Sequence, residues 1–140
     1  LSYRLHPSVL DDLGLVEALR AECDRVARLG DMMVKMDVDD VPDDVPDETS
    51  LGPFRVAQQA LNNAVRHGRA SALSVLLSPR GSGLQLAVTD NGSGFDPERS
   101  RERASLGLAS MRERVRLLHG QLDIESTLGR GTTVVAWVPT

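Results

Sequence analysis

A single acidic residue stands where an apolar stretch of the chain ends and a glycine-rich stretch begins. Residues 84–88 have the apolar composition of a buried strand, and Asp90 follows them just before Gly92 and Gly94. A strand would hold the Asp90 carboxylate rigidly at the edge of a sheet, while the glycines permit positive φ angles and a close approach of the backbone to a ligand. The same segment is also compatible with a surface turn in which the carboxylate bonds to the local backbone. Other parts of the chain have to decide between these two interpretations.

A second group of polar side chains lies within residues 54–67, which belong to a helix that we predict over residues 50–67. Gln59, Asn63 and Arg66 are spaced by four and three residues, so they share one polar stripe on this helix. Asn is unfavourable inside a helix, and the pair Asn62 and Asn63 therefore needs a reason. The stripe is either an exposed helix face or a ligand site. The neutral amide oxygen of Asn63 would suit Mg²⁺, which prefers hard oxygen ligands while it bridges phosphates.

The composition indicates one globular domain with an aliphatic core. The chain has 140 residues, of which 41% are hydrophobic and 26% charged. Only 3% are aromatic, so we expect no platform for stacking on nucleic-acid bases and no nucleic-acid partner. Residues 37–48 carry seven acidic residues and no basic one, and removing them from the net charge of −4 leaves +3 for the rest. That remainder is mildly suited to an anionic ligand. Two prolines in the acidic segment favour a solvated loop over a compact metal site.

The chain shows no sign of export or membrane insertion. Cys23 is the one cysteine, which excludes an internal disulfide and fits a reducing compartment. No apolar run approaches the ~18 residues of a membrane span, and no signal peptide is visible. Because the chain begins at Leu1 without a methionine, we interpret it as a fragment of a longer protein. We expect a cytoplasmic, monomeric fragment without membrane contact of its own, although the parent protein could be membrane-anchored.

The periodicity of apolar residues predicts the order of the elements. We expect helices at 12–29, 50–67 and 106–118, strands at 32–38, 72–77, 84–89, 121–125 and 132–138, turns at 78–83 and 128–131, and a polar loop at 96–105. Thr49 or Ser50 is expected to cap the second helix, while Gly30 and Gly120 are expected to end the first and third helices. Hairpin-linked strands with interspersed helices favour a two-layer α/β sandwich, in which helices cover one face of a mixed sheet. The pattern lacks the strict βαβ alternation of a Rossmann domain.

Four short segments occur in an order that resembles a known family of ATP-binding domains. They are Asn63 with its flanking residues, residues 90–94, residues 106–108 with 111–114, and residues 129–132. They resemble the N, G1, G2 and final glycine boxes of the Bergerat-type fold shared by histidine kinases, gyrase, Hsp90 and MutL. Residues 5–15 and the Met-Arg-Glu-Arg run at 111–114 are similar to the NarX/DesK branch of sensor histidine kinases. The resemblance divides the chain into the tail of an upstream dimerisation region, 1–12, and an ATP-binding catalytic domain, 13–140.

The resemblance implies roles for residues around the base of ATP. Asp90 would accept a hydrogen bond from the adenine N6 amine, whereas guanine would present an oxygen there and leave two acceptors facing each other. A buried acceptor without a partner costs about 1–3 kcal/mol, which favours adenine. Thr132 would complete the contact through water, and Gly92 and Gly94 would keep the floor of the pocket open. Residues 96–105 would form a mobile lid.

The resemblance also implies how the phosphates are held. Gly107, at the start of a helix, would allow backbone N–H groups and the positive helix end to meet phosphate, although a plain helix-entry glycine is the alternative. Asn63 would hold Mg²⁺, and Arg66 and His67 would stand near the phosphates. We include Asn62 and Leu108 among the nucleotide-binding residues. ATP and Mg²⁺ are therefore the expected ligands.

Two positions depart from the family pattern. Gln59 stands where the family has a glutamate that acts as general base, and an amide cannot accept a proton at any useful pH. We therefore expect Gln59 to suppress hydrolysis of ATP more than transfer of its phosphoryl group. Ser105 stands at the junction of lid and helix, where a glycine would be expected, which bears on the flexibility of the lid.

The function implied by the resemblance is that of the catalytic domain of a sensor histidine kinase. In the intact protein, the γ-phosphoryl group would pass to a histidine on an upstream dimerisation helix and then to a response regulator. The chain's own histidines, His6, His67 and His119, do not lie in a suitable acceptor context. Two alternatives stay open at this point, namely a serine kinase of the anti-sigma-factor type and a nucleotide-binding module that has lost activity.

Overall fold

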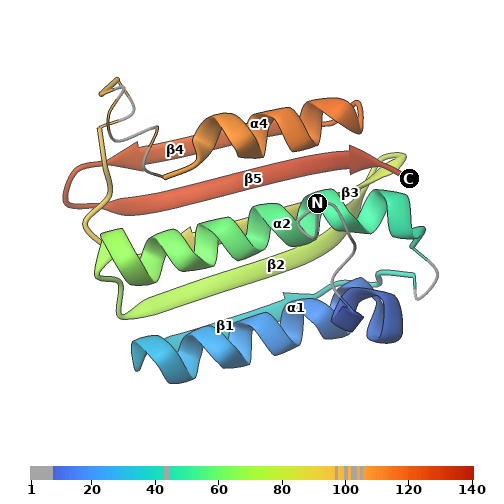
Figure 1. Cartoon of the computed structure of the whole chain (residues 1–140), viewed down its shortest axis with the longest axis horizontal. Helices are drawn as coiled ribbons and strands as arrows, with labels where there is room; N and C mark the ends of the chain where they lie inside the picture. The colour runs from blue at the N-terminus through green and yellow to red at the C-terminus, as the bar shows by residue number, and fades with distance from the viewer. Residues whose placement is uncertain (1–7, 43–44, 97, 100, 102–103, 105) are drawn as a thin grey trace.

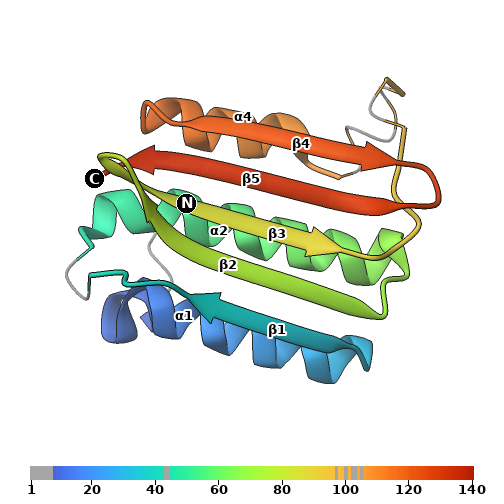
Figure 2. The ribbon, with the colours of Figure 1, turned by 180° about the vertical axis from the view of Figure 1, so that it is seen from behind.

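The computed structural model describes residues 8–42, 45–96, 98–99, 101, 104 and 106–140, and within them one mixed sheet carries helices on one face. The elements are α1 (Ser8–Gly30), β1 (Met33–Val38), α2 (Asp47–Asn63), η2 (Ala64–Gly68), β2 (Ala72–Arg80), β3 (Gly83–Asp90), α4 (Leu108–Leu117), β4 (Gln121–Thr127) and β5 (Gly131–Pro139). The helices lie in front of the sheet in Figure 1, and the bare face of the sheet is seen from behind in Figure 2. This arrangement confirms the predicted two-layer α/β sandwich.

The strand order places β3 in the middle of the sheet. The order is β1-β2-β3-β5-β4, with β1 and β2 parallel and the other neighbours antiparallel. At the end of β3, Asp90 pairs with Leu73 of β2 on one side and with Thr132 of β5 on the other. The carboxylate of Asp90 is therefore attached to a backbone that is fixed from both sides.

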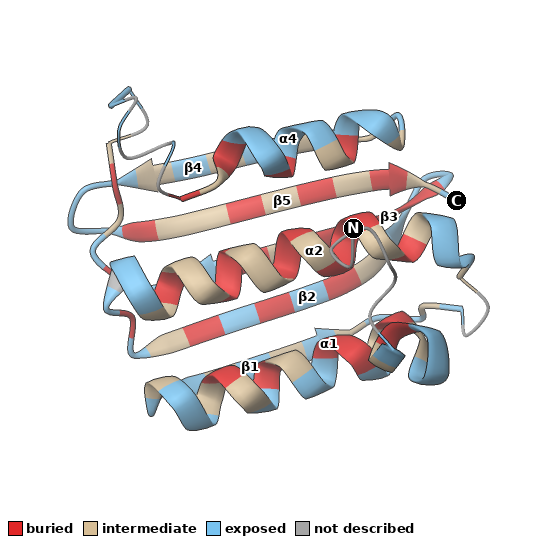
Figure 3. Ribbon diagram, viewed as in Figure 1, coloured by how far each residue is buried: buried red, intermediate tan, exposed pale blue. Residues whose placement is uncertain are grey.

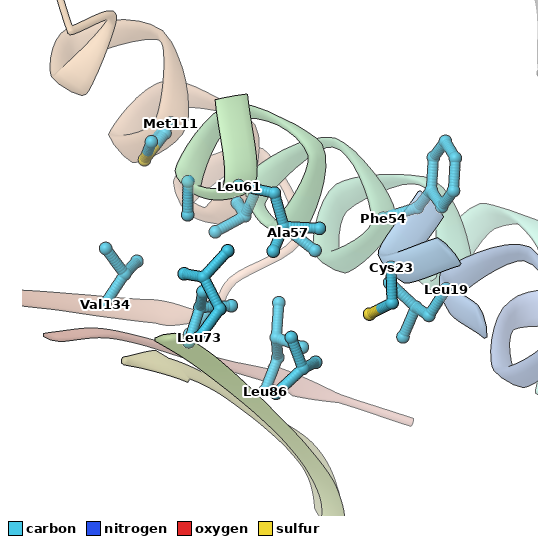
Figure 4. Close-up of a cluster of buried hydrophobic side chains, with 14 of the residues drawn as sticks. Leu19, Cys23, Phe54, Ala57, Leu61, Leu73, Leu86, Met111 and Val134 are labelled. Atoms are coloured by element: carbon cyan, nitrogen blue, oxygen red, sulfur yellow. The ribbon is translucent and has the colours of Figure 1, made fainter. Parts of the chain in front are cut away.

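The core fills the space between the sheet and the helices. On β3, Leu84, Leu86 and Val88 are buried and alternate with side chains that face the other side of the sheet, as the period of a strand requires. Figure 3 shows the same alternation of buried and less buried positions along β2 and β5. Figure 4 shows Leu61 of α2 above Leu73 of β2, with Met111 of α4 beside them. These packed aliphatic side chains fix α2 and α4 on the sheet.

The predicted ends of two helices are corrected by the structure. The left-handed residue after α1 is Asp31, with a φ of 48°, and the one after α4 is His119, with a φ of 61°. Neither Gly30 nor Gly120 has a positive φ. The N–H groups of His119 and Gly120 bind the carbonyl oxygens of Arg116 and Val115, both at 2.9 Å, which closes the end of α4. The left-handed residue is therefore the one after Gly30 at the end of α1 and the one before Gly120 at the end of α4.

The predicted starts of α1 and α2 also differ. α1 begins at Ser8 and passes through Gly14, whose φ of 82° interrupts the helix. α2 begins at Asp47 after Pro46, and its Ser50 hydroxyl donates to the Pro46 carbonyl at 3.0 Å instead of capping a free N–H. Proline before the first turn starts the helix without a side-chain cap, because its fixed φ is compatible with helix entry.

α2 ends earlier than the periodicity predicts. Its regular part stops at Asn63, and residues Ala64–Gly68 form a π-helical turn that reaches Arg69, a residue with a φ of 51°. Single π-turns inside helices are often found at functional sites. Here the turn carries Arg66 and His67, so their directions differ from those of a continued α-helix.

Apart from β1, the strands are longer than predicted. β2 and β3 meet at a turn of only Gly81 and Ser82, so most of the predicted turn 78–83 belongs to the sheet. The pairing of Arg80 with Gly83 brings the Trp137 ring close, and a Cβ at Gly83 would lie 2.5 Å from it. The predicted upstream segment 1–7, which contains His6, lies outside the described residues, as does Ser105.

Candidate functional site

The Asp90 carboxylate is half-buried at the end of β3 and is held by backbone N–H groups. Its Oδ1 accepts a hydrogen bond from the Gly92 N–H at 2.8 Å, and the Thr132 N–H also donates to it. Burial raises the pKa of Asp90, and the two N–H donors act in the opposite direction. The carboxylate therefore makes the local hydrogen bond of a turn and also lines a cavity, so the structure is compatible with both interpretations of this segment.

That cavity lies between the sheet, α2 and the start of α4. Its polar lining consists of Asp90, Asn63, His67 and Thr132, and its apolar lining includes Ala60, Val88, Phe95, Leu106, Met111 and Val134. Apolar walls with one carboxylate at the edge suit a flat heterocycle that offers an exocyclic N–H. The cavity measures about 40 Å³, which is room for a few water molecules. A nucleotide base needs more room than this, so lining side chains would have to move outward on binding.

Close backbone contacts explain two of the glycines near Asp90. Gly94 has a φ of 66°, and a Cβ there would lie 2.2 Å from the Thr127 carbonyl oxygen. Gly131 has a φ of 87°, and its Cβ would lie 2.2 Å from the Asp90 carbonyl oxygen. Gly92 does not have a positive φ and is not among the residues that line the cavity, so its place in the floor of a nucleotide site stays a prediction. Its contribution is the N–H that holds Asp90.

Replacing Gly131 with Ala is expected to lower the free energy of unfolding by about 1–3 kcal/mol, because a Cβ would be forced against a backbone oxygen at a left-handed φ. Thermal or urea unfolding of the purified chain measures this loss. Gly129→Ala provides the control, since Gly129 also has a positive φ of 83° but has no atom within 4 Å of its Cβ position. If both variants lose equal stability, the close contact of Gly131 with Asp90 contributes nothing.

A serine that the sequence did not single out supports the same corner. The hydroxyls of Ser126 and Thr132 are hydrogen-bonded at 2.7 Å, and the Phe95 N–H donates to the Ser126 oxygen at 2.9 Å. Ser126 thereby joins β4 to β5 and to the segment after Asp90. Nothing in the local sequence of β4 points to this role, because it depends on register across the sheet.

Gln59 and Asn63 project from α2 toward the start of α4. The Asn63 Nδ2 donates to the Leu106 carbonyl oxygen at 2.8 Å, and the Gln59 Nε2 donates to the same oxygen at 3.0 Å. Gln59 Nε2 also donates to the Asn63 Oδ1 at 3.2 Å. A glutamate at position 59 has no N–H to make these two contacts, so the amide holds Leu106 over the cavity in a way that the acid would not.

The donor set around Asn63 is compatible with a weakly held divalent cation. A carbonyl oxygen has two lone pairs, and one of those on Asn63 Oδ1 receives Gln59. Mg²⁺ keeps several waters and takes one or two protein oxygens plus phosphate oxygens, so a single amide oxygen fits such a site. Among the described residues, no group of three or more His, Cys, Asp or Glu side chains could hold a metal by itself.

The remaining predicted residues line one of two neighbouring cavities, with the exception of Arg66. His67 and Leu108 line the cavity beside Asp90, whereas Arg66 is exposed and does not line it. Asn62 faces away from Asn63: its Oδ1 accepts a hydrogen bond from Arg25 at 3.1 Å, and it lines a second cavity between α2 and α4 with Gly107. Asn62 and Asn63 are separated because consecutive helix residues point about 100° apart.

Part of the predicted lid is described by the structure. The Glu98 N–H donates to the Asp96 carboxylate at 3.0 Å, and Arg99, Arg101 and Ala104 are exposed. The other positions of the predicted lid, residues 97, 100, 102, 103 and 105, lie outside the described residues. At its far end, Gly107 has a φ of 70°, and a Cβ there would lie 3.0 Å from the Gln59 amide nitrogen.

Residues 48–140 match the sequence profile of the histidine kinase-, DNA gyrase B- and HSP90-like ATPases. The chain belongs to this ATPase family. Among curated proteins, it is 40% identical to the sensor histidine kinase MctS of Rhizobium johnstonii over 99% of its own length and 30% of that relative. The chain therefore spans less than a third of this kinase.

Solved structures of the family share the fold. The blue-light activated histidine kinase EL346 of Erythrobacter litoralis superimposes with a TM-score of 0.72 at 26% identity, over 86% of this chain and 40% of that one. The ATP binding domain of PrrB from Mycobacterium tuberculosis superimposes with a TM-score of 0.65 at 26% identity, over 88% of this chain and 91% of that one. Family membership supports ATP as the nucleotide of this domain.

None of the helices in the described ranges is both long and apolar enough to cross a membrane. The finer placement in the NarX/DesK branch stays a prediction.

Proposed function

We propose that this domain binds ATP with Mg²⁺ and, in the intact protein, donates the γ-phosphoryl group to a histidine on an upstream dimerisation helix. A response regulator would then receive the group, and the protein would act in two-component signalling. In this proposal, residues 13–140 form the catalytic domain and 1–12 the tail of the dimerisation region. MctS is named a sensor histidine kinase and EL346 a light-activated histidine kinase, which favours this acceptor over the serine of an anti-sigma-factor-type kinase.

The Asp90 carboxylate is the observation that carries the nucleotide assignment. It is a half-buried acceptor at the edge of an apolar cavity, and two backbone N–H groups keep it in place. In the proposed complex, the Asp90 carboxylate accepts a hydrogen bond from the N6 amine of adenine. Thr132 completes the contact with the base through a water molecule. Gly94 lets the backbone of the turn come close to the base. Guanine would place an oxygen against the carboxylate.

The phosphates and Mg²⁺ are proposed to lie toward α2 and the start of α4. Asn63 would offer the second lone pair of its Oδ1 to Mg²⁺, since Gln59 donates to the first. Gly107 would let backbone N–H groups approach phosphate, and His67 would stand at the mouth of the cavity. Mg²⁺ would supply charge neutralisation to the phosphates, while these residues bind and orient the nucleotide.

Isothermal titration calorimetry with ATP and GTP, each with and without Mg²⁺, tests this function on the purified chain. ATP is expected to bind with an affinity about 5- to 150-fold higher than GTP, because guanine would leave the Asp90 carboxylate facing an oxygen at a cost of about 1–3 kcal/mol. Removing Mg²⁺ is expected to weaken ATP binding. Equal affinities for ATP and GTP would contradict the role of Asp90, and the lack of any heat with either nucleotide would contradict the function.

One observation favours a second candidate, a nucleotide-binding module that has lost activity. Gln59 replaces the family's general base with an amide, and its side chain is engaged with Leu106 and Asn63. Reconstitution of the intact protein with radiolabelled ATP distinguishes the two candidates. Phosphate on a histidine supports the kinase, and tight ATP binding without any phosphohistidine supports the inactive module.

A further inference from the structure

The cavity between α2 and α4 is lined by basic and amide side chains and lies beside the nucleotide cavity. It measures about 310 Å³, and its lining includes Arg55, Gln58, Gln59, Asn62, Gly107 and Arg114. None of the described residues that line it is acidic. Figure 1 shows α4 and α2 side by side on the same face of the sheet. The concentration of positive charge in a hollow without a carboxylate needs an explanation.

Arg55 is held in this cavity with part of its guanidinium group unpaired. Its Nη1 donates to the Gln58 Oε1 at 2.7 Å, while its Nε is buried and has no hydrogen-bond partner in the described structure. A buried N–H of a charged group without an acceptor is costly, so an anionic ligand that supplied an acceptor would be favoured here.

Arg114 increases the unfavourable charge at the same place. Burial is the main factor that lowers the pKa of Arg55, and the positive charge of Arg114 adds to it, while Glu22 acts in the opposite direction. Glu22 cannot neutralise both arginines, because its carboxylate is paired with Arg25 at 2.9 Å. Within the part of the chain that the structure describes, Arg114 has no carboxylate partner. An anion between the two guanidinium groups would satisfy both.

The position of Arg55 is set by a chain of polar contacts that begins on α1. Gln58 Nε2 donates to the Glu22 Oε1 at 3.5 Å, and Arg25, paired with the same carboxylate, donates to Asn62 at 3.1 Å. Arg55 is therefore oriented by Gln58 before any ligand arrives. A guanidinium group in a fixed direction suits the planar, bidentate recognition of phosphate oxygens.

The cavity with Arg55 and Arg114, toward which the phosphates are proposed to extend, adjoins the cavity beside Asp90. Met111 lines both cavities, and the hydrogen-bonded pair Gln59 and Asn63 lies between them, with Gln59 on the arginine side and Asn63 on the side of Asp90. Gly107 and Ser110, in the first turn of α4, also line the arginine side. A nucleotide whose base lies beside Asp90 would thus extend past Asn63 toward Arg55.

We propose that Arg55 and Arg114 form a subsite for the terminal phosphoryl group of the nucleotide and that Gln58 is the residue that positions Arg55. The subsite rests on the proposed binding of ATP and adds to it the residues that distinguish a triphosphate from a diphosphate. ADP, which lacks the third phosphate, would leave the subsite unfilled.

Calorimetric titration of the chain with ADP and with a non-hydrolysable ATP analogue, both in Mg²⁺, tests the subsite. Arg55→Gln and Arg114→Gln are each expected to weaken binding of the analogue about tenfold or more, since each removes a charge-assisted hydrogen bond to phosphate. Both variants are expected to change ADP binding less than threefold. Arg55→Lys, which keeps the charge without the planar fork, is expected to fall between Arg55→Gln and the wild type.

Arg116→Gln is the matched control, because Arg116 is exposed on α4 and pairs with Glu113 away from the cavity. Equal losses of affinity for ADP and the analogue would show that the arginines affect the fold or the binding of the base. Unchanged affinities for both ligands would show that the cavity binds a different anion, such as a carboxylate of a docking helix. Either result overturns the subsite while leaving ATP binding intact. If the wild-type chain binds neither nucleotide, the proposed function and the subsite fail together.

Discussion

Asp90→Asn is expected to weaken ATP binding roughly 10- to 150-fold, because it removes a charge-assisted hydrogen bond worth about 1.5–3 kcal/mol. The carboxylate has two acceptor oxygens, and it already receives the N–H groups of Gly92 and Thr132. An amide has one acceptor oxygen and two N–H donors. Whichever way the Asn side chain turns, an NH₂ group faces either the backbone N–H donors or the adenine amine. The loss is measured by calorimetric titration with ATP.

The same substitution is not expected to unfold the protein at neutral pH. Burial raises the pKa of Asp90 above its value in the unfolded chain. A carboxyl group of this kind favours the folded state at low pH and loses that contribution as the pH rises through its folded pKa. At pH 7 the ionised form is therefore a cost to the fold, and the neutral amide removes it. Loss of ATP binding without loss of thermal stability is the expected combination.

Asp123→Asn provides the matched control for this prediction. Asp123 is exposed on β4, and its neighbours Leu122 and Ile124 pack against the core, so its own side chain faces the bare side of the sheet. It is expected to bind ATP as the wild type does. If Asp90→Asn also binds ATP with unchanged affinity, the base does not lie beside Asp90 and the assignment of the cavity is wrong.

Gln59→Glu is expected to increase hydrolysis of ATP by about 10²- to 10⁴-fold, the usual contribution of a well-placed general base. Position 59 lies beside Asn63 and Gly107, where the phosphates are proposed to lie, and a carboxylate there can accept a proton from water. The change also removes both hydrogen bonds of the Gln59 amide, at 3.0 Å to Leu106 and 3.2 Å to Asn63. Leu106 would then be freer to move off the cavity. Release of inorganic phosphate from the purified chain measures the rate.

Gln85→Glu is the control for the Gln59 prediction. Gln85 lies on β3 between the buried residues Leu84 and Leu86, so it faces the side of the sheet that carries no helices, where it accepts a hydrogen bond from Arg80 at 3.3 Å. Hydrolysis is expected to stay at the wild-type level in this variant. Rapid ATP turnover by the wild-type chain, at a rate typical of gyrase, would refute the view that Gln59 suppresses hydrolysis.

The sequence predicts the elements well where local periodicity determines burial. The alternation of Leu84, Leu86 and Val88 identifies β3, and the spacing of Leu108, Met111 and Val115 identifies α4, because these side chains bury one face of a regular element. Helix ends are less well predicted. Asp31, and not Gly30, takes the left-handed conformation, while the glycine at position 30 leaves room for the Met32 side chain, which would lie 2.9 Å from a Cβ there.

The proposed site residues show the same division between local and long-range signals. Asp90, Asn63, Gly107 and Thr132 could be selected from the sequence because each stands in a short motif of characteristic composition. Ser126 could not be selected, because its hydrogen bond to Thr132 depends on the register of β4 with β5. The difference in direction between Asn62 and Asn63 follows from helix geometry, but the cavity that each one faces depends on where α4 packs.

By itself, the sequence determined which side chains are available for chemistry and on which local elements they lie, because strand and helix periods are properties of neighbouring residues. Only the tertiary structure decided which of them meet. Arg55 and Arg114 are separated by 59 positions in the chain, and they share one cavity because α2 and α4 pack side by side on the sheet. Likewise, Gln59 holds Leu106 through a contact that no local pattern encodes. The packing of distant elements brings the two arginine side chains together, and the residues next to each arginine in the sequence give no indication of it.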